Sequence, residues 1–276
     1  ASVTLLDTPG HVDFSAEMER TLQVLDYAVL IVSGADGVQG HTETLWRLLR
    51  RYRIPVFIFV NKMDQKWTDR DAVLASLKER LDHGVVDFSG VIGNEDVLTF
   101  SASAEPFAAV CRDPEEAAEE IATCDEALLE AYLADGTLKT DDVRKVIHDR
   151  KLFPCFFGSA LKLSGVREFL TALGEFASCP DYTKDFGAKV FKISRDEAGV
   201  RMTHLKVTGG SLKIRDSLSP DSEEKINQIR LYSGSKFEAL KEAEPGMVVA
   251  VTGISDTRPG QVFGTASESA LPLLEP

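Results

Sequence analysis

Three short polar segments each follow an apolar run of the chain, and their residue types suit the binding of a nucleotide. The first is Asp7-Thr8-Pro9-Gly10-His11. An aspartate that closes a buried strand can hold Mg²⁺ directly or through water, and a glycine one turn later lets a backbone N–H approach a terminal phosphate. His11 could then orient an attacking water molecule. Taken alone, an aspartate and a glycine in a strand-end loop occur in many folds.

The second segment, Asn61-Lys62-Met63-Asp64, has the groups that a guanine base requires. The Asp64 carboxylate can accept hydrogen bonds from the ring N–H and the exocyclic amine of guanine, an arrangement that adenine does not offer. The Asn61 amide can bond the N7/O6 side, and the aliphatic stem of Lys62 can cover the ring face. An unmatched base would leave polar groups unsatisfied, so discrimination can be large. The alternative is an ordinary polar loop, but the position directly after a buried strand favours the base site.

The third segment, Gly158-Ser159-Ala160-Leu161, follows another apolar run. Its small residues would let backbone N–H groups reach an oxygen of the base. By itself this segment is a common strand-to-helix turn. Together and in this order, each after its own strand, the three segments predict one guanine nucleotide site.

The elements that must position these segments are predicted from the hydrophobic pattern. Runs typical of strands buried on both faces of a parallel sheet are Val3–Leu6, Ala28–Val32, Val56–Val60 and Phe153–Phe157. Amphipathic helices are predicted over His41–Tyr52 and Val166–Phe176, and a docked helix with an acidic outer face over Asp113–Glu130. This alternation predicts an α/β domain with a doubly wound sheet, in which ligands bind at the carboxyl ends of the strands.

After residue 178 the pattern changes to short strand-like runs separated by turn signals. Residues 179–187 have no periodicity and are predicted to be a linker, and residues 188–266 are predicted to form a small all-β barrel. The strand-like runs are Ala188–Ser194, Met202–Val207, Ser211–Ile214, Lys225–Leu231 and Met247–Ile254. The predicted domains are therefore 1–178 and 188–266, with 267–276 as a second linker.

Composition and charge exclude several classes of protein. The 276 residues are 43% hydrophobic and 27% charged, which excludes a disordered chain, collagen-like repeats and a disulfide scaffold. A net charge of −13 argues against nonspecific nucleic-acid binding, although residues 179–276 are nearly neutral. We expect no membrane-spanning run and no signal peptide. The four cysteines have no zinc or redox spacing, which predicts reduced thiols in a cytoplasmic protein.

On these motifs, the sequence resembles the translational GTPases of the elongation factor G type. The segment 7–11 resembles their second switch loop, Asn61–Asp64 the guanine-specificity loop, and Gly158–Leu161 the last base-contacting loop. The resemblance covers essentially the whole chain, since Ala188–Thr265 is similar to the β-barrel second domain. It implies a P-loop-GTPase-like sheet, GTP or GDP as ligand, and Mg²⁺ held by Asp7 through water. It also implies GTP hydrolysis with His11 positioning water, in a monomer that binds rRNA and ribosomal proteins.

Within that family the sequence resembles in particular the tetracycline-resistance ribosomal protection proteins. Asp64 is followed by Gln65 rather than the arginine usual in the elongation factor, and the segment between Asp64 and Gly158 is compact. This implies displacement of tetracycline by the GTP-bound form. Translocation and release-factor recycling stay open, as does a ribosome-binding module with a vestigial nucleotide site. In that module rRNA phosphates would contact Lys206, Lys213, Arg215, Lys225 and Arg230, whereas the favoured alternative for each of these residues is an ordinary solubilising surface charge.

The resemblance also implies a phosphate-binding loop of the form Gly-x₄-Gly-Lys-Ser/Thr before Asp7. No Gly-Lys dipeptide occurs in the chain. We therefore expect the sequence to be a piece of a longer protein, and the 276 residues alone to bind guanine nucleotide weakly without hydrolysing GTP. Trp46 and Trp67 are expected to be packing residues. Ordinary surface or core positions are expected for His41, His83, His148 and His204.

Overall fold

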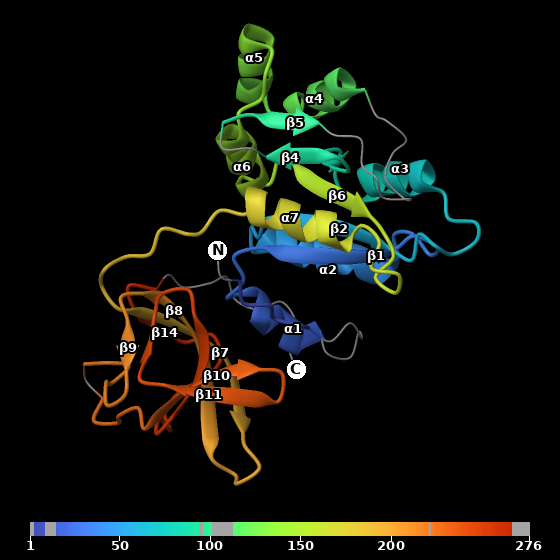
Figure 1. Cartoon of the computed structure of the whole chain (residues 1–276). Helices are drawn as coiled ribbons and strands as arrows, with labels where there is room; N and C mark the ends of the chain where they lie inside the picture. The colour runs from blue at the N-terminus through green and yellow to red at the C-terminus, as the bar shows by residue number, and fades with distance from the viewer. Residues whose placement is uncertain (1–2, 9–14, 94–95, 101–112, 221, 267–276) are drawn as a thin grey trace. The chain divides into compact units, whose positions relative to one another are not determined.

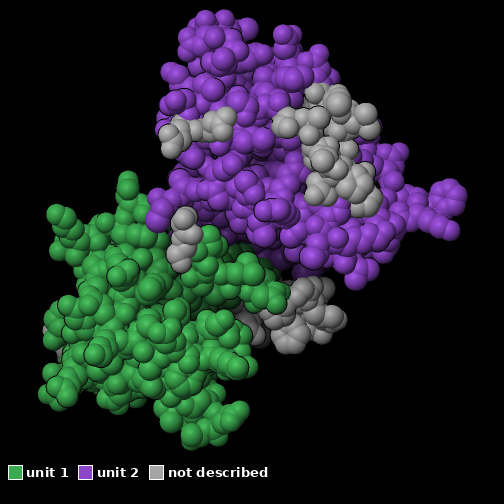
Figure 2. Space-filling view, viewed as in Figure 1, with its two compact units in different colours: residues 1–25, 180–276 green, residues 26–179 purple. Residues whose placement is uncertain are grey.

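The computed structural model describes residues 3–8, 15–93, 96–100, 113–220 and 222–266. The chain divides into two compact units, coloured in Figure 2: unit 1 contains residues 1–25 and 180–276, and unit 2 contains residues 26–179. The predicted first domain, 1–178, differs from this division in residues 1–25. These residues group with unit 1 because α1 (Ser15–Leu22) contacts β7 (Gly187–Arg195) and the Lys206 ammonium donates to the Val24 carbonyl at 3.1 Å.

Unit 2 is built on a parallel sheet with the strand order β1-β2-β6-β3 (Figure 1). The strands are β1 (Ala28–Ser33), β2 (Val56–Asn61), β6 (Phe153–Phe157) and β3 (Val85–Asp87). All five residues of β6 are buried, and so are the first five of β2, as expected for central strands covered on both faces. The strands predicted over 28–32, 56–60 and 153–157 are confirmed.

Helices cover both faces of this sheet. Trp46 of α2 (Gly40–Arg51) packs on Phe153 with 4.8 Å between ring centroids, and Phe169 of α7 (Val166–Phe176) packs on Phe156 at 5.4 Å. Residues 153 and 156 point to opposite faces of β6 because strand side chains alternate. Helices α2 and α7 therefore lie on opposite sides, and the predicted doubly wound α/β architecture is confirmed.

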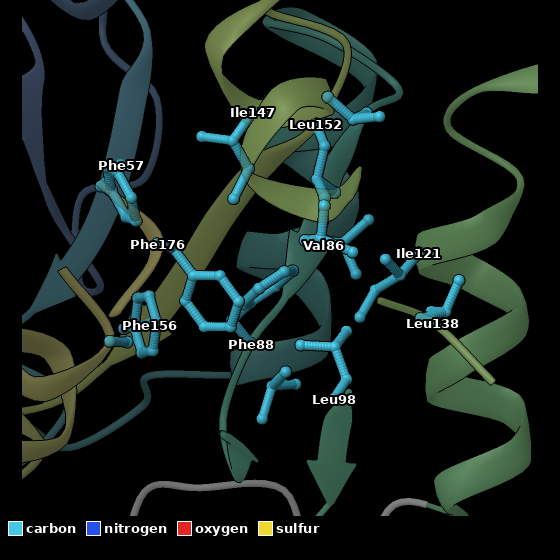
Figure 3. Close-up of a cluster of buried hydrophobic side chains, with 14 of the residues drawn as sticks. Phe57, Val86, Phe88, Leu98, Ile121, Leu138, Ile147, Leu152, Phe156 and Phe176 are labelled. Atoms are coloured by element: carbon cyan, nitrogen blue, oxygen red, sulfur yellow. The ribbon is translucent and has the colours of Figure 1, made fainter. Parts of the chain in front are cut away.

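A large hydrophobic core of unit 2 is formed by residues of the sheet, of α7 and of the helices between residues 114 and 148 (Figure 3). Phe88 and Phe176 meet edge to face with 5.4 Å between ring centroids, an arrangement worth about 1 kcal/mol beyond the area that it buries. Because Phe176 belongs to α7, this core fixes the helix that follows the third polar segment. The other elements are α3 (Arg70–Arg80), α4 (Pro114–Ala122), α5 (Glu126–Asp135), α6 (Thr140–His148), β4 (Val91–Gly93) and β5 (Leu98–Phe100).

The strand predicted over Val3–Leu6 is wrong. Residues 3–8 have no regular secondary structure, and the side chains of Val3 and Leu5 are 70% and 83% exposed. An apolar run becomes a strand only where neighbouring strands satisfy its N–H and C=O groups. In the described part of the chain no strand pairs with this segment.

The single helix predicted over Asp113–Glu130 is two helices, α4 and α5. The break comes at Asp125, whose side chain accepts a hydrogen bond from the Leu128 N–H at 3.1 Å and caps a new helix. Helical spacing did not reveal the break because Ile121 and Leu128, on either side of it, are both buried.

Unit 1 contains an antiparallel sheet with the order β11-β10-β13-β8-β7-β14, and β12 pairs with β9. Its core is apolar, with Leu205, Ile229 and Val251 completely buried, and this antiparallel β domain confirms the prediction. Strand β11 was not predicted, because four of its five residues are exposed and no buried apolar run identifies it. The strands after β7 are β8 (Arg201–Gly209), β9 (Leu212–Lys213), β10 (Gln228–Ser233), β11 (Lys236–Leu240), β12 (Glu242–Ala243), β13 (Val248–Thr252) and β14 (Val262–Gly264).

Two of the five basic residues predicted to reach rRNA are engaged inside unit 1. Lys206 is 5% exposed, and the Arg230 guanidinium pairs with the Asp196 carboxylate at 3.0 Å. Successive side chains of a strand point to opposite faces of the sheet, and a long basic side chain on the covered face is buried. The position of a basic residue in the strand, rather than its charge, therefore decides whether RNA can reach it. Lys213, Arg215 and Lys225 are exposed.

Trp46 is buried, as predicted, but the prediction for Trp67 is wrong because its side chain is 97% exposed in a loop. His204 is an ordinary interior residue: burial, with Lys192 nearby, lowers its pKa to about 4, and its ring bonds the Ser194 hydroxyl at 2.7 Å. None of the helices within the described ranges has the length and apolar character needed to cross a membrane.

Candidate functional site

The loop after β2 is held by the side chain of Asn61. Its Oδ1 atom accepts hydrogen bonds from the Lys62 N–H at 2.8 Å and from the Ala160 N–H at 2.9 Å. Both partners are backbone donors, so the oxygen of the amide must face them and Nδ2 must point to the other side. One side chain therefore joins the loops that follow two neighbouring strands, β2 and β6.

Lys62 and Met63 set the path of this loop. Lys62 has a left-handed backbone (φ +64°), which turns the chain so that the Met63 N–H donates to the Gly158 carbonyl at 3.0 Å. The Met63 side chain is buried against Gly34, where an added Cβ would lie 2.6 Å from the Met63 sulfur. The Gly34 N–H donates to the Asn61 carbonyl at 2.7 Å. The ends of β1, β2 and β6 are thus joined, and Met63 anchors the loop from inside.

Asp64 presents a carboxylate whose ionised form is stabilised. Its hydrogen bond with the Ser159 hydroxyl, together with the Lys162 ammonium 3.6 Å from Oδ2, holds the pKa of Asp64 below its ordinary value. The Asp64 side chain is 15% exposed, which leaves it accessible from one side. A positioned, accessible and ionised carboxylate is suited to accept two hydrogen bonds from a ligand.

The loop after β6 is closed by a reciprocal pair of hydrogen bonds. The Ser159 N–H donates to the Ser164 carbonyl at 3.0 Å, and the Ser164 N–H donates back to the Ser159 carbonyl at 3.1 Å. A side chain at Gly158 would collide with this closure, since its Cβ would lie 2.3 Å from the Ser164 carbonyl oxygen. The N–H groups of Ser159 and Ala160 are hydrogen-bonded within the protein in this structure, and the predicted contact of this segment with a base oxygen stays a prediction.

The structure brings together the second and third predicted segments. Asn61, Lys62, Met63 and Asp64 meet Ser159 and Ala160 through the bonds above, and the Leu161 side chain beside them is 90% exposed. Sequence reasoning missed Gly34, Lys162 and Ser164. It also missed Thr68, whose hydroxyl donates to the Met63 carbonyl at 2.9 Å, and Gly165, where a Cβ would lie 2.5 Å from the Phe157 carbonyl oxygen. A signal existed for Gly34, which, like the predicted segments, directly follows an apolar strand.

The first predicted segment is described only in part. Asp7 and Thr8 belong to unit 1, with the Asp7 side chain exposed, and Pro9, Gly10 and His11 lie outside the described residues. Among the described residues, no three His, Cys, Asp or Glu side chains are grouped to hold a metal ion. A single carboxylate is short of the octahedral oxygen shell that Mg²⁺ takes. The magnesium role of Asp7 and the catalytic role of His11 remain predictions.

Comparison with known proteins matches both parts of the chain. Residues 1–178 match the family model of the elongation factor Tu GTP binding domain, and residues 185–266 match that of elongation factor G domain 2. The chain belongs to the translational GTPases. A crystal structure of a protein from Thermus thermophilus is similar over 95% of this chain, with 26% sequence identity and a TM-score of 0.77. The match covers 44% of that protein, so this chain spans less than half of its length.

Membership in the translational GTPases agrees with the chemistry at the ends of β2 and β6. A domain of the elongation factor Tu GTP-binding type has guanine nucleotide as its ligand class, and the family in general acts with GTP on the ribosome. The predicted order, a parallel α/β sheet followed by an antiparallel β domain, is confirmed by the two matches in sequence order.

Proposed function

We propose that the loops after β2 and β6 bind the guanine base of GTP or GDP. The observation that carries this proposal is the double use of Asn61 Oδ1, which accepts from Lys62 and Ala160 and so leaves Nδ2 for a ligand. An amide N–H donates, and N7 and O6 of guanine both accept hydrogen bonds. Asn61 is therefore suited to the N7/O6 side of the base.

Asp64 completes the recognition from the other side of the base. Its ionised carboxylate accepts from the ring N–H and the exocyclic amine of guanine, whereas adenine would place an acceptor nitrogen against it. The exposed stem of Lys62 and the exposed Leu161 side chain supply apolar surface for the faces of the ring. Guanine is preferred because adenine would offer the carboxylate neither of these two N–H donors.

GTP hydrolysis is proposed on the segment 7–11. His11 would position the attacking water, and the loop of Thr8, Pro9 and Gly10 would approach the terminal phosphate. Asp7 would hold Mg²⁺ through water, and the ion would neutralise charge on the phosphates. This chain spans 44% of the length of its relative from Thermus thermophilus, and it contains no Gly-Lys dipeptide of a phosphate-binding loop. Hydrolysis is therefore proposed for a protein that also supplies that loop.

The proposed setting is the cytoplasmic ribosome, where the protein acts as a monomer and its GTP-bound form displaces tetracycline. The support is the sequence resemblance, including Gln65 after Asp64. Expression of a protein that contains this chain together with the phosphate-binding loop, in a tetracycline-sensitive bacterium, should raise the inhibitory concentration of the drug. An unchanged concentration would favour translocation or release-factor recycling instead.

The exposed Lys213, Arg215 and Lys225 favour a second candidate, a ribosome-binding module with a vestigial nucleotide site. Such a module would bind ribosomes without nucleotide, and its affinity would fall steeply with salt because phosphate contacts release counterions. Ribosome binding that requires GTP would reject the module and support the nucleotide-dependent switch.

The base assignment is tested by Asp64→Asn. An amide donor at this position would face a carbonyl of xanthine, so we expect preference to move from GMP to XMP, with at least about a tenfold loss for GMP. The measurement is an NMR titration that follows the amide signals of Lys62 and Ala160. Asp71→Asn, an exposed aspartate at the start of α3, is the matched control and should leave the preference for GMP unchanged. Unchanged GMP affinity in Asp64→Asn would refute base reading by this carboxylate.

A further inference from the structure

A shallow apolar hollow lies at the start of α7, directly after the loop that contains Ser159. This hollow, which we call the α7 hollow, has a volume of about 400 Å³. It is lined by Leu163, Val166, Arg167, Leu170 and Thr171. The side chains of Leu163 and Leu170 are 74% and 57% exposed. Exposed apolar side chains that form a contiguous patch mark interaction surfaces, whereas single scattered ones are normal on any protein.

Leu163 is also held in an unfavourable backbone conformation. Its φ of +56° lies in the left-handed region, which bulky residues rarely adopt because Cβ approaches the backbone. A leucine at this position is both strained and exposed, so the fold gains little from keeping it. Strain at an exposed residue points to a role outside the folding of the chain.

The charge around the α7 hollow is positive although the whole chain has a net charge of −13. Arg167 lines the hollow, and Lys162 lies between the exposed Leu161 and Leu163. Of the described residues that line it, none is acidic.

The carboxylates of α7 are used elsewhere in unit 2. Glu168 accepts a hydrogen bond from the Gly90 N–H at 2.6 Å, and Glu175 accepts from the Gly93 N–H at 3.0 Å. The exposed face of α7 is therefore apolar and cationic, and a complementary partner would be apolar and acidic.

The spacing of this surface fits a helix as the occupant. On α7, Arg167, Leu170 and Gly174 follow one another at three and four residues, and Leu163 lies in the loop just before the helix. A Cβ at Gly174 would meet no heavy atom within 4 Å. A stripe of this kind provides a groove into which the ridge of a second helix packs. We propose that the α7 hollow docks an amphipathic helix of a partner protein, with leucine-sized side chains in the hollow and carboxylates facing Lys162 and Arg167.

The proposal goes beyond guanine recognition. Lys162 also pairs with Asp64 at 3.6 Å, but Arg167 and the leucines of the α7 hollow take no part in the guanine site. The probe is a fluorescent helical peptide with leucines at i, i+4 and i+7, flanked by glutamates, and binding to the whole chain is measured by anisotropy. Leu170→Ser should weaken binding about tenfold, since one buried leucine is lost. Leu133→Ser, which changes a leucine on α5 that is 75% exposed, is the matched control and should leave binding unchanged.

Two further experiments test the proposed charge match and the strain at Leu163. A peptide with lysines in place of the glutamates should bind more weakly, and equal binding would overturn the proposed charge match. Leu163→Asn should raise the Tm, because asparagine tolerates positive φ, and should also weaken peptide binding. The proposal is overturned if the unaltered chain does not bind the peptide, if Leu170→Ser and Leu133→Ser behave alike, or if an RNA oligonucleotide displaces the peptide.

Discussion

At the end of β2, Asn61 is both a joint between two loops and a group left for a ligand. Its oxygen is used by the backbone of Lys62 and Ala160, and its nitrogen is turned away from both. The two roles belong to different atoms of one amide, so substitutions can separate them.

We expect Asn61→Ala to lower the free energy of unfolding by about 1–3 kcal/mol, because two backbone N–H groups lose their acceptor. Asn61→Asp keeps an acceptor for both and should cost less, but it replaces the donor nitrogen with a second oxygen and should abolish GMP binding. Urea unfolding measures the first effect and an NMR titration the second. Equal stability of the two variants would contradict the structural role of Oδ1.

The residues that would contact a ligand are easier to predict from sequence than the residues that hold them in place. Asn61 and Asp64 were predicted because base recognition needs an amide and a carboxylate after a strand. Ser164 and Gly34 were not, since their roles arise from contacts with residues distant in the sequence: Ser164 closes the loop on Ser159, and Gly34 makes room for Met63.

At the scale of elements, the start of α5 depends on Asp125. Its carboxylate accepts from the Leu128 N–H, and the hydrogen bond from Lys151 holds its pKa below the ordinary value. Asp125→Ala should lower the free energy of unfolding by about 1 kcal/mol at neutral pH because the cap is lost. Asp125→Asn keeps a capping oxygen and should cost less.

The pH dependence of this cap follows from the lowered pKa. The charged carboxylate contributes stability at pH values above its ordinary pKa of about 3.9, and this contribution is lost as pH falls through the lower pKa of the folded state. Chemical unfolding at several pH values should therefore show the wild-type chain losing its advantage over Asp125→Asn in acid. An advantage that persists in acid would show that charge at Asp125 does not stabilise the helix.

The elements predicted correctly are those whose environment is uniform. Central strands such as β2 and β6 are buried on both faces, so a continuous apolar run identifies them. The same kind of run at Val3–Leu6 is not a strand, because pairing depends on neighbours rather than on the run itself. Strand β11 was missed although it is a strand. It pairs with β10, but its side chains are mostly exposed and so form no buried apolar run.

At the scale of the whole molecule, the two large hydrophobic cores share no residue. Both tryptophans, Trp46 and Trp67, belong to unit 2, so tryptophan fluorescence reports the unfolding of that unit. Leu205→Ala, at a fully buried position of unit 1, should destabilise that unit by about 2–5 kcal/mol and leave the fluorescence transition in place. Circular dichroism should detect the shifted transition.

Ile121→Ala is the matched control, since Ile121 is fully buried in unit 2. It should move the fluorescence transition to lower denaturant concentration. If Leu205→Ala moved the fluorescence transition as far as Ile121→Ala, the two cores would unfold as one cooperative unit.

Strand β1 has β2 as its neighbour on one side, and within the described ranges no strand adjoins its other side. Strand β1 is thus an edge strand. Its sequence, Ala-Val-Leu-Ile-Val-Ser, has no charged residue, proline or bulge of the kind that usually protects an edge strand from pairing, and its Ile31 side chain is 64% exposed. An open row of amide and carbonyl groups can accept any extended segment, including one from another copy. Self-association by strand addition, rather than weakness of either core, is therefore what we expect to limit how concentrated a solution of these 276 residues can be kept.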